Sequence, residues 1–263
     1  MTTPAHADGL FDYRQTQDFA RKYLRSYYSG EPQADERRLS RFLVEQAPRL
    51  PEGPFLELGC GPTVHHLLPL VPQVTALHVR DYLEENLHEV RRWRAGEPGA
   101  HDWRPFTRAA LADAGLPSDE LAVSARERLV RQRLVSIGRC NLLEDPPPHE
   151  LGAFPAVGCF YCAEEIGVTL PAWRLVMRRV AAHVAPGGTL LLASLAGMTS
   201  FAMTRDDGSI EHLPCAPVEL EHLRELLPEL GFPQATSRIE HCPIAVPDVG
   251  VTATLLVAAR KAA

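Results

Sequence analysis

The chain has 263 residues, 45% of them apolar, which is enough for one large α/β domain. Its formal net charge is -6 with acids and bases interleaved, which argues against a nucleic-acid partner, because such partners select a basic face. No stretch approaches the roughly 18 consecutive apolar residues of a membrane span, and the first residues lack the pattern of a signal peptide, so we expect a cytoplasmic protein with no membrane partner.

Residues 10–47 predict two helices that precede any strand. The segments FARKYLRSYY and ADERRLSRFLVEQA both show helical spacing of apolar residues, and they lie outside the alternation of strands and helices that follows. We therefore expect a helical lid over residues 1–47. Residues 48–263 are expected to form the core of a single domain that spans 1–263.

From residue 55 onward, strands and helices alternate, as is typical of a parallel sheet with helices on both faces. Buried strands are expected at 55–58, 74–79, 134–143, 156–162, 189–195 and 251–261, with a helix over 80–93. The clearest helix begins at Leu170, with apolar residues at helical spacing: Trp173, Val176, Met177, Val180, Ala181 and Val184. Pro186-Gly187-Gly188 is expected to end it.

Two glycines follow the first strand in the segment FLELGCGP, and such a turn can serve a nucleotide or only packing. A dinucleotide site needs a third glycine, but Val64 stands there, and Pro62 removes one backbone N–H from the turn. S-adenosylmethionine instead needs glycines that let the backbone approach the nucleoside and an acid that accepts the ribose hydroxyls. Glu57-x-Gly59-x-Gly61, with Asp81 after the next strand, supplies both.

The six cysteines predict neither a disulfide scaffold nor a metal site. They are too few for a disulfide scaffold in a chain of this length. Cys159 and Cys162 form one C-x-x-C pair, typical of a redox site or half a zinc site, but no second pair or H-x-x-x-H accompanies it. We expect buried thiols and no bound metal.

Four segments carry a more specific signal than the glycine turn alone: FLELGCGPTVHHLL, RDYLEENLHEVRRWRAGEPGAHDWRPF, YCAEE and HVAPGGTLLLAS. Together they resemble the family of nicotinamide, phenylethanolamine and indolethylamine N-methyltransferases, and the resemblance runs from Phe19 to Lys261. It implies a Rossmann-like class I methyltransferase fold, with a seven-stranded, mostly parallel sheet whose last strand is antiparallel. Because lysine occurs only at Lys22 and Lys261 among 27 basic residues, we expect a bacterial member.

The resemblance implies S-adenosylmethionine as the cofactor and assigns residues to its site. Tyr23 and Tyr28 would cover it from the lid, Asp81 would hold the ribose and Asn86 the methionine end. Asn141 and Leu142 stand where the family usually has Asp-Val near the adenine. The full set of expected cofactor residues is Tyr23, Tyr28, Glu57, Gly59, Cys60, Gly61, Thr63, His65, Asp81, Tyr82, Asn86, Asn141 and Leu142.

The methyl acceptor is expected to be a small, aromatic amine or azaheterocycle bound by a monomer. Glu164 is the expected catalytic acid, because ligands sit at the strand ends of open α/β sheets and the family has an acid there. Glu165 is its rival, since adjacent strand residues point to opposite sides. Two other family acids are replaced by Ser194 and Met198. The expected acceptor residues are Tyr27, Tyr161, Glu164, Glu165, Ser194, Met198, Phe201, His212 and Asp248.

The sequence leaves three other functions open. Transfer to an oxygen or sulfur acceptor uses the same cofactor site, although metal-dependent O-methylation would need clustered oxygen ligands. An oxidoreductase with a nicotinamide cofactor would use the same alternation of strands and helices. A protein that binds S-adenosylmethionine without transferring its methyl group would keep the motif and lose the chemistry.

Overall fold

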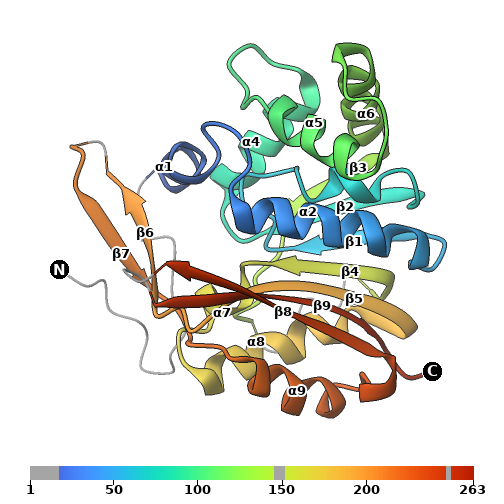
Figure 1. Ribbon diagram of the computed structural model, residues 1–263, viewed down its shortest axis with the longest axis vertical. Helices are drawn as coiled ribbons and strands as arrows, with labels where there is room; N and C mark the ends of the chain where they lie inside the picture. The colour runs from blue at the N-terminus through green and yellow to red at the C-terminus, as the bar shows by residue number, and fades with distance from the viewer. Residues whose placement is uncertain (1–17, 145–151, 206, 247–249) are drawn as a thin grey trace.

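A computed structural model describes residues 18–144, 152–205, 207–246 and 250–263. Its main feature is a seven-stranded sheet with helices on both faces (Figure 1). The strands, in sheet order, are β3 (Leu134–Arg139), β2 (Ala76–Asp81), β1 (Pro54–Leu58), β4 (Phe154–Phe160), β5 (Val184–Ala196), β9 (Val251–Arg260) and β8 (Ser237–Val246).

The strand directions match the expected fold. Strands β1 to β5 pair in parallel, whereas β9 is antiparallel to both β5 and β8, so the last strand of the chain is antiparallel. The expected class I methyltransferase sheet is therefore confirmed. Strand β8 is the one that no sequence pattern indicated, because Arg238, Glu240 and Pro243 interrupt its apolar residues. It lies at the sheet edge, where proline and charged residues are tolerated.

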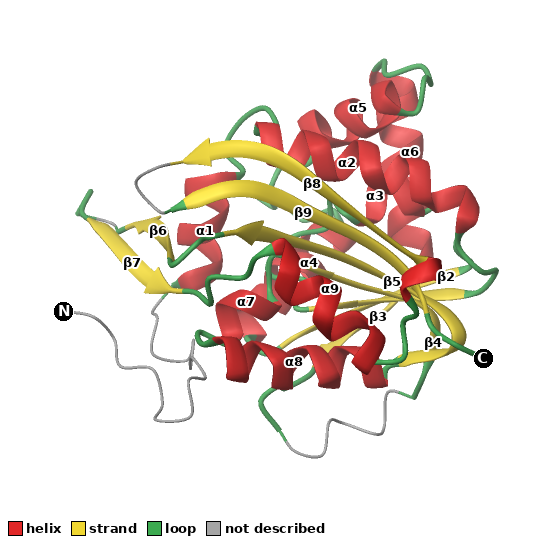
Figure 2. Cartoon of the chain, turned by 60° about the horizontal axis from the view of Figure 1, so that its bottom comes forward, coloured by secondary structure: helices red, strands yellow, loops and turns green. Residues whose placement is uncertain are grey.

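Helices cover both faces of the sheet. Figures 1 and 2 show α8 and α9 on one face and α2, α5 and α6 on the other. The described helices are α1 (Phe19–Tyr27), α2 (Ala34–Gln46), α3 (Leu67–Leu70), α4 (Glu84–Ala95), α5 (Arg104–Asp113), α6 (Glu120–Arg133), α7 (Ala163–Ile166), α8 (Leu170–Ala182) and α9 (Leu220–Glu229), with 3-10 turns at Ala47–Arg49 and Gln234–Thr236.

Strand β1 shows why the sheet needs cover on both sides. Phe55 packs in the apolar cluster that includes α2 and α5 residues, whereas Leu56 and Leu58 pack in the cluster that includes α8 and α9 residues. All three side chains are fully buried. Burial on both faces is typical of parallel strands and gives the near-continuous apolar run seen in the sequence.

Helix α8 has the expected apolar stripe but ends earlier than expected. Thr169 caps its start by accepting a hydrogen bond from the Ala172 amide, and the helix stops at Ala182. Pro186-Gly187-Gly188 lies inside β5, not at the helix end. The β4–β5 pairing shifts its register there, and Gly187 takes a positive φ of 71°, so the glycine serves an irregular strand start.

The N-terminal segment and a small hairpin complete the molecule. Of the lid expected over 1–47, residues 1–17 lie outside the described part, and α1 and α2 are the two helices within the rest. Helix α1 packs beside the hairpin of β6 (Ser200–Thr204) and β7 (Ile210–Pro214), which the sequence did not indicate. The described helices are all too short or too polar to cross a bilayer.

Candidate functional site

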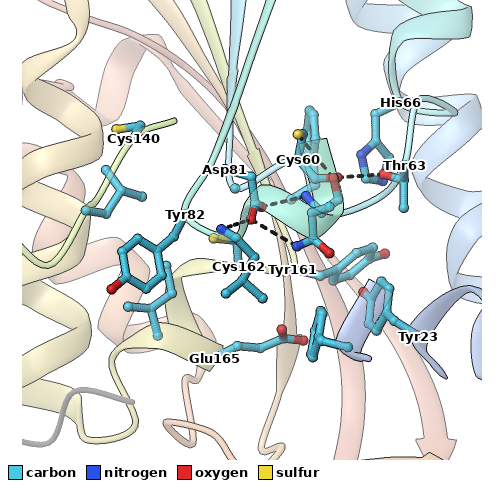
Figure 3. A pocket seen from close by; sticks show the side chains of 18 of the residues that line it. Tyr23, Cys60, Thr63, His66, Asp81, Tyr82, Cys140, Tyr161, Cys162 and Glu165 are labelled. Carbon is cyan, nitrogen blue, oxygen red and sulfur yellow. Dashed lines mark hydrogen bonds between the residues drawn. The ribbon is translucent and has the colours of Figure 1, made fainter. Parts of the chain in front are cut away.

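The main cavity opens where β1, β2 and β4 end, at the edge where open α/β sheets bind ligands (Figure 3). The glycine turn after β1, the start of α4, α1 and α7 surround it. Its lining residues are Phe19, Tyr23, Tyr28, Gly59, Cys60, Gly61, Thr63, His66, Asp81, Tyr82, Leu83, Asn86, Cys140, Asn141, Leu142, Leu143, Phe160, Tyr161, Cys162, Glu165 and Ile166.

Most of the cofactor residues expected from the sequence line this cavity. They are Tyr23, Tyr28, Gly59, Cys60, Gly61, Thr63, Asp81, Tyr82, Asn86, Asn141 and Leu142. Glu57 and His65 do not. The cavity also includes His66, Cys140 and Cys162, which were not expected there; strand-end position alone could have suggested Cys140, which follows β3. The roles of these residues toward a cofactor stay predictions.

The two glycines of the turn do different things. Both have positive φ, 68° at Gly59 and 59° at Gly61, a region that favours glycine. A Cβ at Gly59 would overlap with Cys162 Sγ, so this glycine permits packing of the turn against the end of β4. A Cβ at Gly61 would meet nothing closer than 3.9 Å, beside Thr63 and Tyr23 of the cavity. The missing side chain of Gly61 therefore leaves open space in the cavity, whereas that of Gly59 does not.

This difference predicts unequal effects of alanine at the two positions. Gly61→Ala adds only the backbone strain of positive φ, about 1–2 kcal/mol, whereas Gly59→Ala adds a steric overlap with Cys162 as well. We expect Gly59→Ala to lower the free energy of unfolding by a further 1–3 kcal/mol or so. Urea unfolding of the two variants measures this. Equal stabilities would contradict the packing role of Gly59.

Asp81 holds the cavity together from the end of β2. Its Oδ2 accepts a hydrogen bond from the Gly61 amide at 2.8 Å, and its Oδ1 accepts from the Leu83 amide and from Asn86 Nδ2, each at 2.9 Å (Figure 3). Burial raises the pKa of this carboxyl, and the hydrogen bonds oppose that rise. Since a carboxylate can accept about four hydrogen bonds, Asp81 keeps capacity for a ligand hydroxyl.

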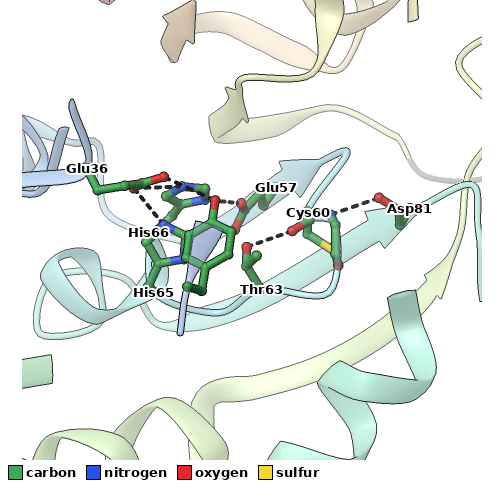
Figure 4. Close-up of polar contacts among 9 residues, drawn as sticks. Glu36, Glu57, Cys60, Thr63, His65, His66 and Asp81 are labelled. Carbon is green, nitrogen blue, oxygen red and sulfur yellow. Dashed lines mark hydrogen bonds and ion pairs between the residues drawn. The ribbon is translucent and has the colours of Figure 1, made fainter. Parts of the chain in front are cut away.

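Glu57 and His65 point into a buried polar network beside the cavity. Glu57 Oε1 accepts a hydrogen bond from His66 Nδ1 at 2.8 Å, and His65 Nε2 contacts Glu36 Oε2 at 2.8 Å (Figure 4). His65 also stacks on Trp103, with ring centroids 5.0 Å apart. Its neighbour His66 reaches the cavity wall in its place. His65, which was expected to contact the cofactor, does not line the cavity, because the turn rotates successive side chains to different sides.

Glu165 and Tyr161 contribute two further polar groups to the cavity wall, Glu165 from α7 and Tyr161 beside Tyr23 (Figure 3). Glu165 is half-buried on α7. Tyr161 takes a positive φ of 48°, which is uncommon for a bulky residue, and its buried hydroxyl has no hydrogen-bond partner among the described residues. Burial raises the pKa of Tyr161, so the hydroxyl keeps its proton. It is a donor available to a ligand.

Glu164, the expected catalytic residue, does not line the cavity. Its side chain is fully buried, and its Oε1 accepts a hydrogen bond from the Leu195 amide at 3.3 Å. Burial raises the pKa of this carboxyl from 4.5 to about 7, and Ser194 and the Leu195 amide offset the rise only in part. Glu164 therefore serves the contact of α7 with β5, whereas its neighbour Glu165 faces the ligand space.

The raised pKa of Glu164 predicts a stability that falls with rising pH. Between pH 4.5 and 7 the unfolded chain loses this proton while the folded chain keeps it, so the free energy of unfolding drops. At about 1.4 kcal/mol per pKa unit, the total loss is roughly 3 kcal/mol. Burial also raises the pKa of Asp35 to about 6, so this carboxyl adds a loss of its own in every variant. Urea unfolding at pH 5 and 8 should therefore show a loss that is roughly 3 kcal/mol smaller in Glu164→Gln than in the wild type or in Glu165→Gln. The same loss in all three would assign it to another group.

The other expected acceptor residues lie outside the cavity wall. Met198 and Phe201 are buried in an apolar cluster between α1 and the β6–β7 hairpin, and Tyr27 packs against that cluster and donates a hydrogen bond to the Ala202 carbonyl. His212 is exposed on β7, and Ser194 is buried beside Glu164. Asp248 lies outside the described residues. That these residues contact the methyl acceptor stays a prediction.

The residues of the cavity fit an S-adenosyl group by their chemistry. Asn86 Oδ1 and the Tyr161 hydroxyl are buried without partners among the described residues, so each can bond a ligand. Asp81 offers an acceptor, and Tyr23, Tyr28 and Phe160 offer aromatic surface. Pro62 in the turn still argues against a pyrophosphate, because it has no N–H to donate.

Comparison with known proteins gives the family. The profile of the NNMT/PNMT/TEMT family matches residues 11–252. The chain belongs to this family. The resemblance drawn from the sequence motifs is thereby confirmed, and with it the expected cofactor of the family, S-adenosylmethionine.

Individual relatives are distant. The chain is 30% identical to indolethylamine N-methyltransferase of Mus musculus over 52% of each chain, and 27% identical to nicotinamide N-methyltransferase of Homo sapiens over 65% of this chain and 67% of the relative. It is 27% identical to phenylethanolamine N-methyltransferase of Rattus norvegicus over 68% of this chain and 61% of the relative. The chain thus spans about half to two thirds of the length of these relatives.

Solved structures agree on the fold. A S-adenosylmethionine-dependent methyltransferase from Clostridium acetobutylicum superposes with a TM-score of 0.50 at 13% identity, covering 95% of this chain and 99% of its own. The CcbJ methyltransferase from Streptomyces caelestis gives a TM-score of 0.52 at 14% identity, covering 88% of this chain and 97% of its own. At these identities the likeness is one of fold alone, and the fold is that of class I methyltransferases.

Proposed function

We propose that this family member is a S-adenosylmethionine-dependent methyltransferase that methylates the nitrogen of a small amine or azaheterocycle with aromatic character. The observation that carries the proposal is the cavity itself, whose wall combines Asp81 at the glycine turn with Glu165 and the Tyr161 hydroxyl. Membership of a family whose characterised relatives are N-methyltransferases supports the same reading.

The cofactor end is the part around the glycine turn. Gly61 and Asp81 would hold the nucleoside and its ribose, and Asn86 would hold the methionine end. Tyr23 and Tyr28 would cover the cofactor from the N-terminal segment. When bound, S-adenosylmethionine supplies a methyl group on a positively charged sulfonium. That residues 1–47 form a lid over the bound cofactor stays a prediction.

The acceptor end is the part around Glu165. Its carboxylate attracts an ammonium group, and as the amine gives up its proton the same carboxylate can receive it. The Tyr161 hydroxyl can donate a hydrogen bond to a polar group of the acceptor, and aromatic walls such as Phe160 suit a flat ring. An anionic side chain beside the reacting atom favours amines over phenols or carboxylates, because it would repel an anionic nucleophile.

A thermal-shift screen tests the proposal. Ligands that bind the folded chain raise its unfolding midpoint. We expect a rise with S-adenosylhomocysteine, a further rise with aromatic amines or azaheterocycles in its presence, and smaller shifts with matched phenols and thiols. A rise with NAD or NADP instead would support the oxidoreductase alternative. A rise with S-adenosylhomocysteine and with phenols or thiols but not amines would replace nitrogen by oxygen or sulfur as the acceptor.

A further inference from the structure

A buried cluster beside the cofactor cavity unites residues that lie far apart in the sequence. Glu36 comes from α2, and His65 and His66 come from the turn between β1 and α3 (Figure 4). Glu36 Oε2 lies 2.8 Å from His65 Nε2 and 4.0 Å from His66 Nε2, and one donor atom from each residue lies within 4.8 Å of the other two. Each of the three residues is at most 8% exposed.

His66 carries an unpaired acceptor that points into this cluster. Its Nδ1 lies 2.8 Å from Glu57 Oε1, and because a carboxylate only accepts, Nδ1 carries the proton. Nε2 then bears a lone pair, has no partner among the described residues and faces Glu36 Oε2 at 4.0 Å. A buried lone pair facing a carboxylate oxygen is unfavourable, and a proton, a bridging water or a metal ion between the two atoms relieves it.

We propose that Glu36, His65 and His66 bind a divalent transition-metal ion, for which Zn²⁺ is the best match. Two imidazoles and one carboxylate are a donor set that suits Zn²⁺. In a tetrahedral site with bonds of about 2.1 Å, neighbouring donor atoms lie about 3.4 Å apart. The present separations of 2.8 Å and 4.0 Å lie on either side of that value. Small side-chain movements, together with loss of the proton that His65 Nε2 donates to Glu36, would form the site.

The surroundings have the features of a metal site. The carboxylate of Glu57 on His66 Nδ1 reproduces the carboxylate–histidine–metal arrangement that orients a ligand ring. The Tyr28 hydroxyl donates to Glu36 Oε1 at 3.1 Å and leaves Oε2 for the metal. A second, smaller cavity lined by Ser40, Phe106 and all three ligands reaches the cluster, which provides space for a water as fourth ligand.

The role of the ion would be to attach α2 to the glycine turn. Glu36 belongs to the N-terminal helices, whereas His66 also lines the cofactor cavity and follows Thr63 of its floor. No group of the cluster other than His66 reaches that cavity, so the ion does not take part in methyl transfer. This proposal departs from the expectation of no metal. That expectation rested on ligand spacing along the sequence, and such spacing does not reveal that Glu36 lies next to the two histidines in the fold.

The test is metal binding by the full chain after treatment with a chelator. Calorimetry should give one equivalent of Zn²⁺ with a Kd below about 10 µM, and Co²⁺ should give the visible absorption of a tetrahedral site. Glu36→Gln and His66→Gln should weaken binding at least about 100-fold. Cys159→Ser, which alters the C-x-x-C pair, and His241→Gln on the exposed edge strand should bind as the wild type does.

A second readout separates lost ligands from lost folding. Zn²⁺ should raise the unfolding midpoint of the wild type and of Cys159→Ser, and should leave that of Glu36→Gln unchanged. If His66→Gln does not fold, the isosteric Glu36→Gln decides. No stoichiometric binding by the wild type overturns the proposal, as does binding that survives in Glu36→Gln or disappears in Cys159→Ser.

Discussion

Replacing Asp81 by alanine is expected to weaken S-adenosylmethionine binding by about 100-fold or more. The carboxylate accepts hydrogen bonds from Gly61, Leu83 and Asn86, and it is the acceptor proposed for the ribose. Hydrogen bonds to a charged group contribute about 1.5–3 kcal/mol each, and about 1.4 kcal/mol changes an equilibrium constant tenfold. Loss of the carboxylate releases the turn amide and the ligand contact together. Isothermal titration calorimetry on the folded variant measures the affinity.

A surface acid on the neighbouring helix is the matched control. Glu84 is exposed at the start of α4 and pairs with Arg91, so Glu84→Ala removes one negative charge close to the site without touching the cavity. Its affinity should equal that of the wild type. Asp81→Asn should fall between, because it keeps one carbonyl acceptor and loses the charge. An unchanged affinity in Asp81→Ala would remove Asp81 from the cofactor site.

Glu165→Gln is expected to lower kcat by roughly 100-fold while leaving S-adenosylmethionine affinity unchanged. Its carboxylate is the acidic group on the cavity wall at the end of β4, so it is placed to hold an ammonium group and to receive a proton. Glutamine keeps the shape of the side chain and removes both capacities. Steady-state kinetics with an acceptor found by the thermal-shift screen measures the effect.

Glu164→Gln supplies the comparison. Glu164 is buried next to Ser194 and Leu195, so its substitution should change stability with pH and leave kcat within a few-fold of the wild type. A crippled Glu164→Gln with an active Glu165→Gln would return the acid role to Glu164. Normal turnover in both would mean that positioning of the amine, without a carboxylate, is enough for transfer.

The residues that line the cavity around the glycine turn could be predicted because their signals are local. The glycine turn follows a buried strand, and Asp81 ends the next one, so the rule that ligands sit at the carboxyl edge of a parallel sheet already joins them. The different roles of Gly59 and Gly61 could not be predicted from the turn itself. They depend on Cys162, which follows β4 and contacts the turn only in the folded chain.

The acceptor end could not be predicted to the residue. From the sequence, Glu164 and Glu165 are expected to be successive residues of a strand, but both lie on the short helix α7. The side chains of successive helical residues point in directions about 100° apart. Which of them faces the cavity depends on how α7 docks on β5. A similar one-residue uncertainty applies to His65 and His66, of which only His66 lines the cavity. No local sequence pattern marks Glu36, because only the packing of α2 brings it to the two histidines.

Transfer of a labelled methyl group tests the central claim most directly. The chain is incubated with S-adenosylmethionine that carries a deuterated methyl group and with a panel of aromatic amines, azaheterocycles, phenols and thiols, and the products are analysed by mass spectrometry and NMR. We expect the wild type to form a product with the deuterated methyl group bound to nitrogen. Glu165→Gln and Asp81→Ala should form much less of this product. A methyl group found only on oxygen or sulfur, or equal product from the wild type and both variants, would contradict it.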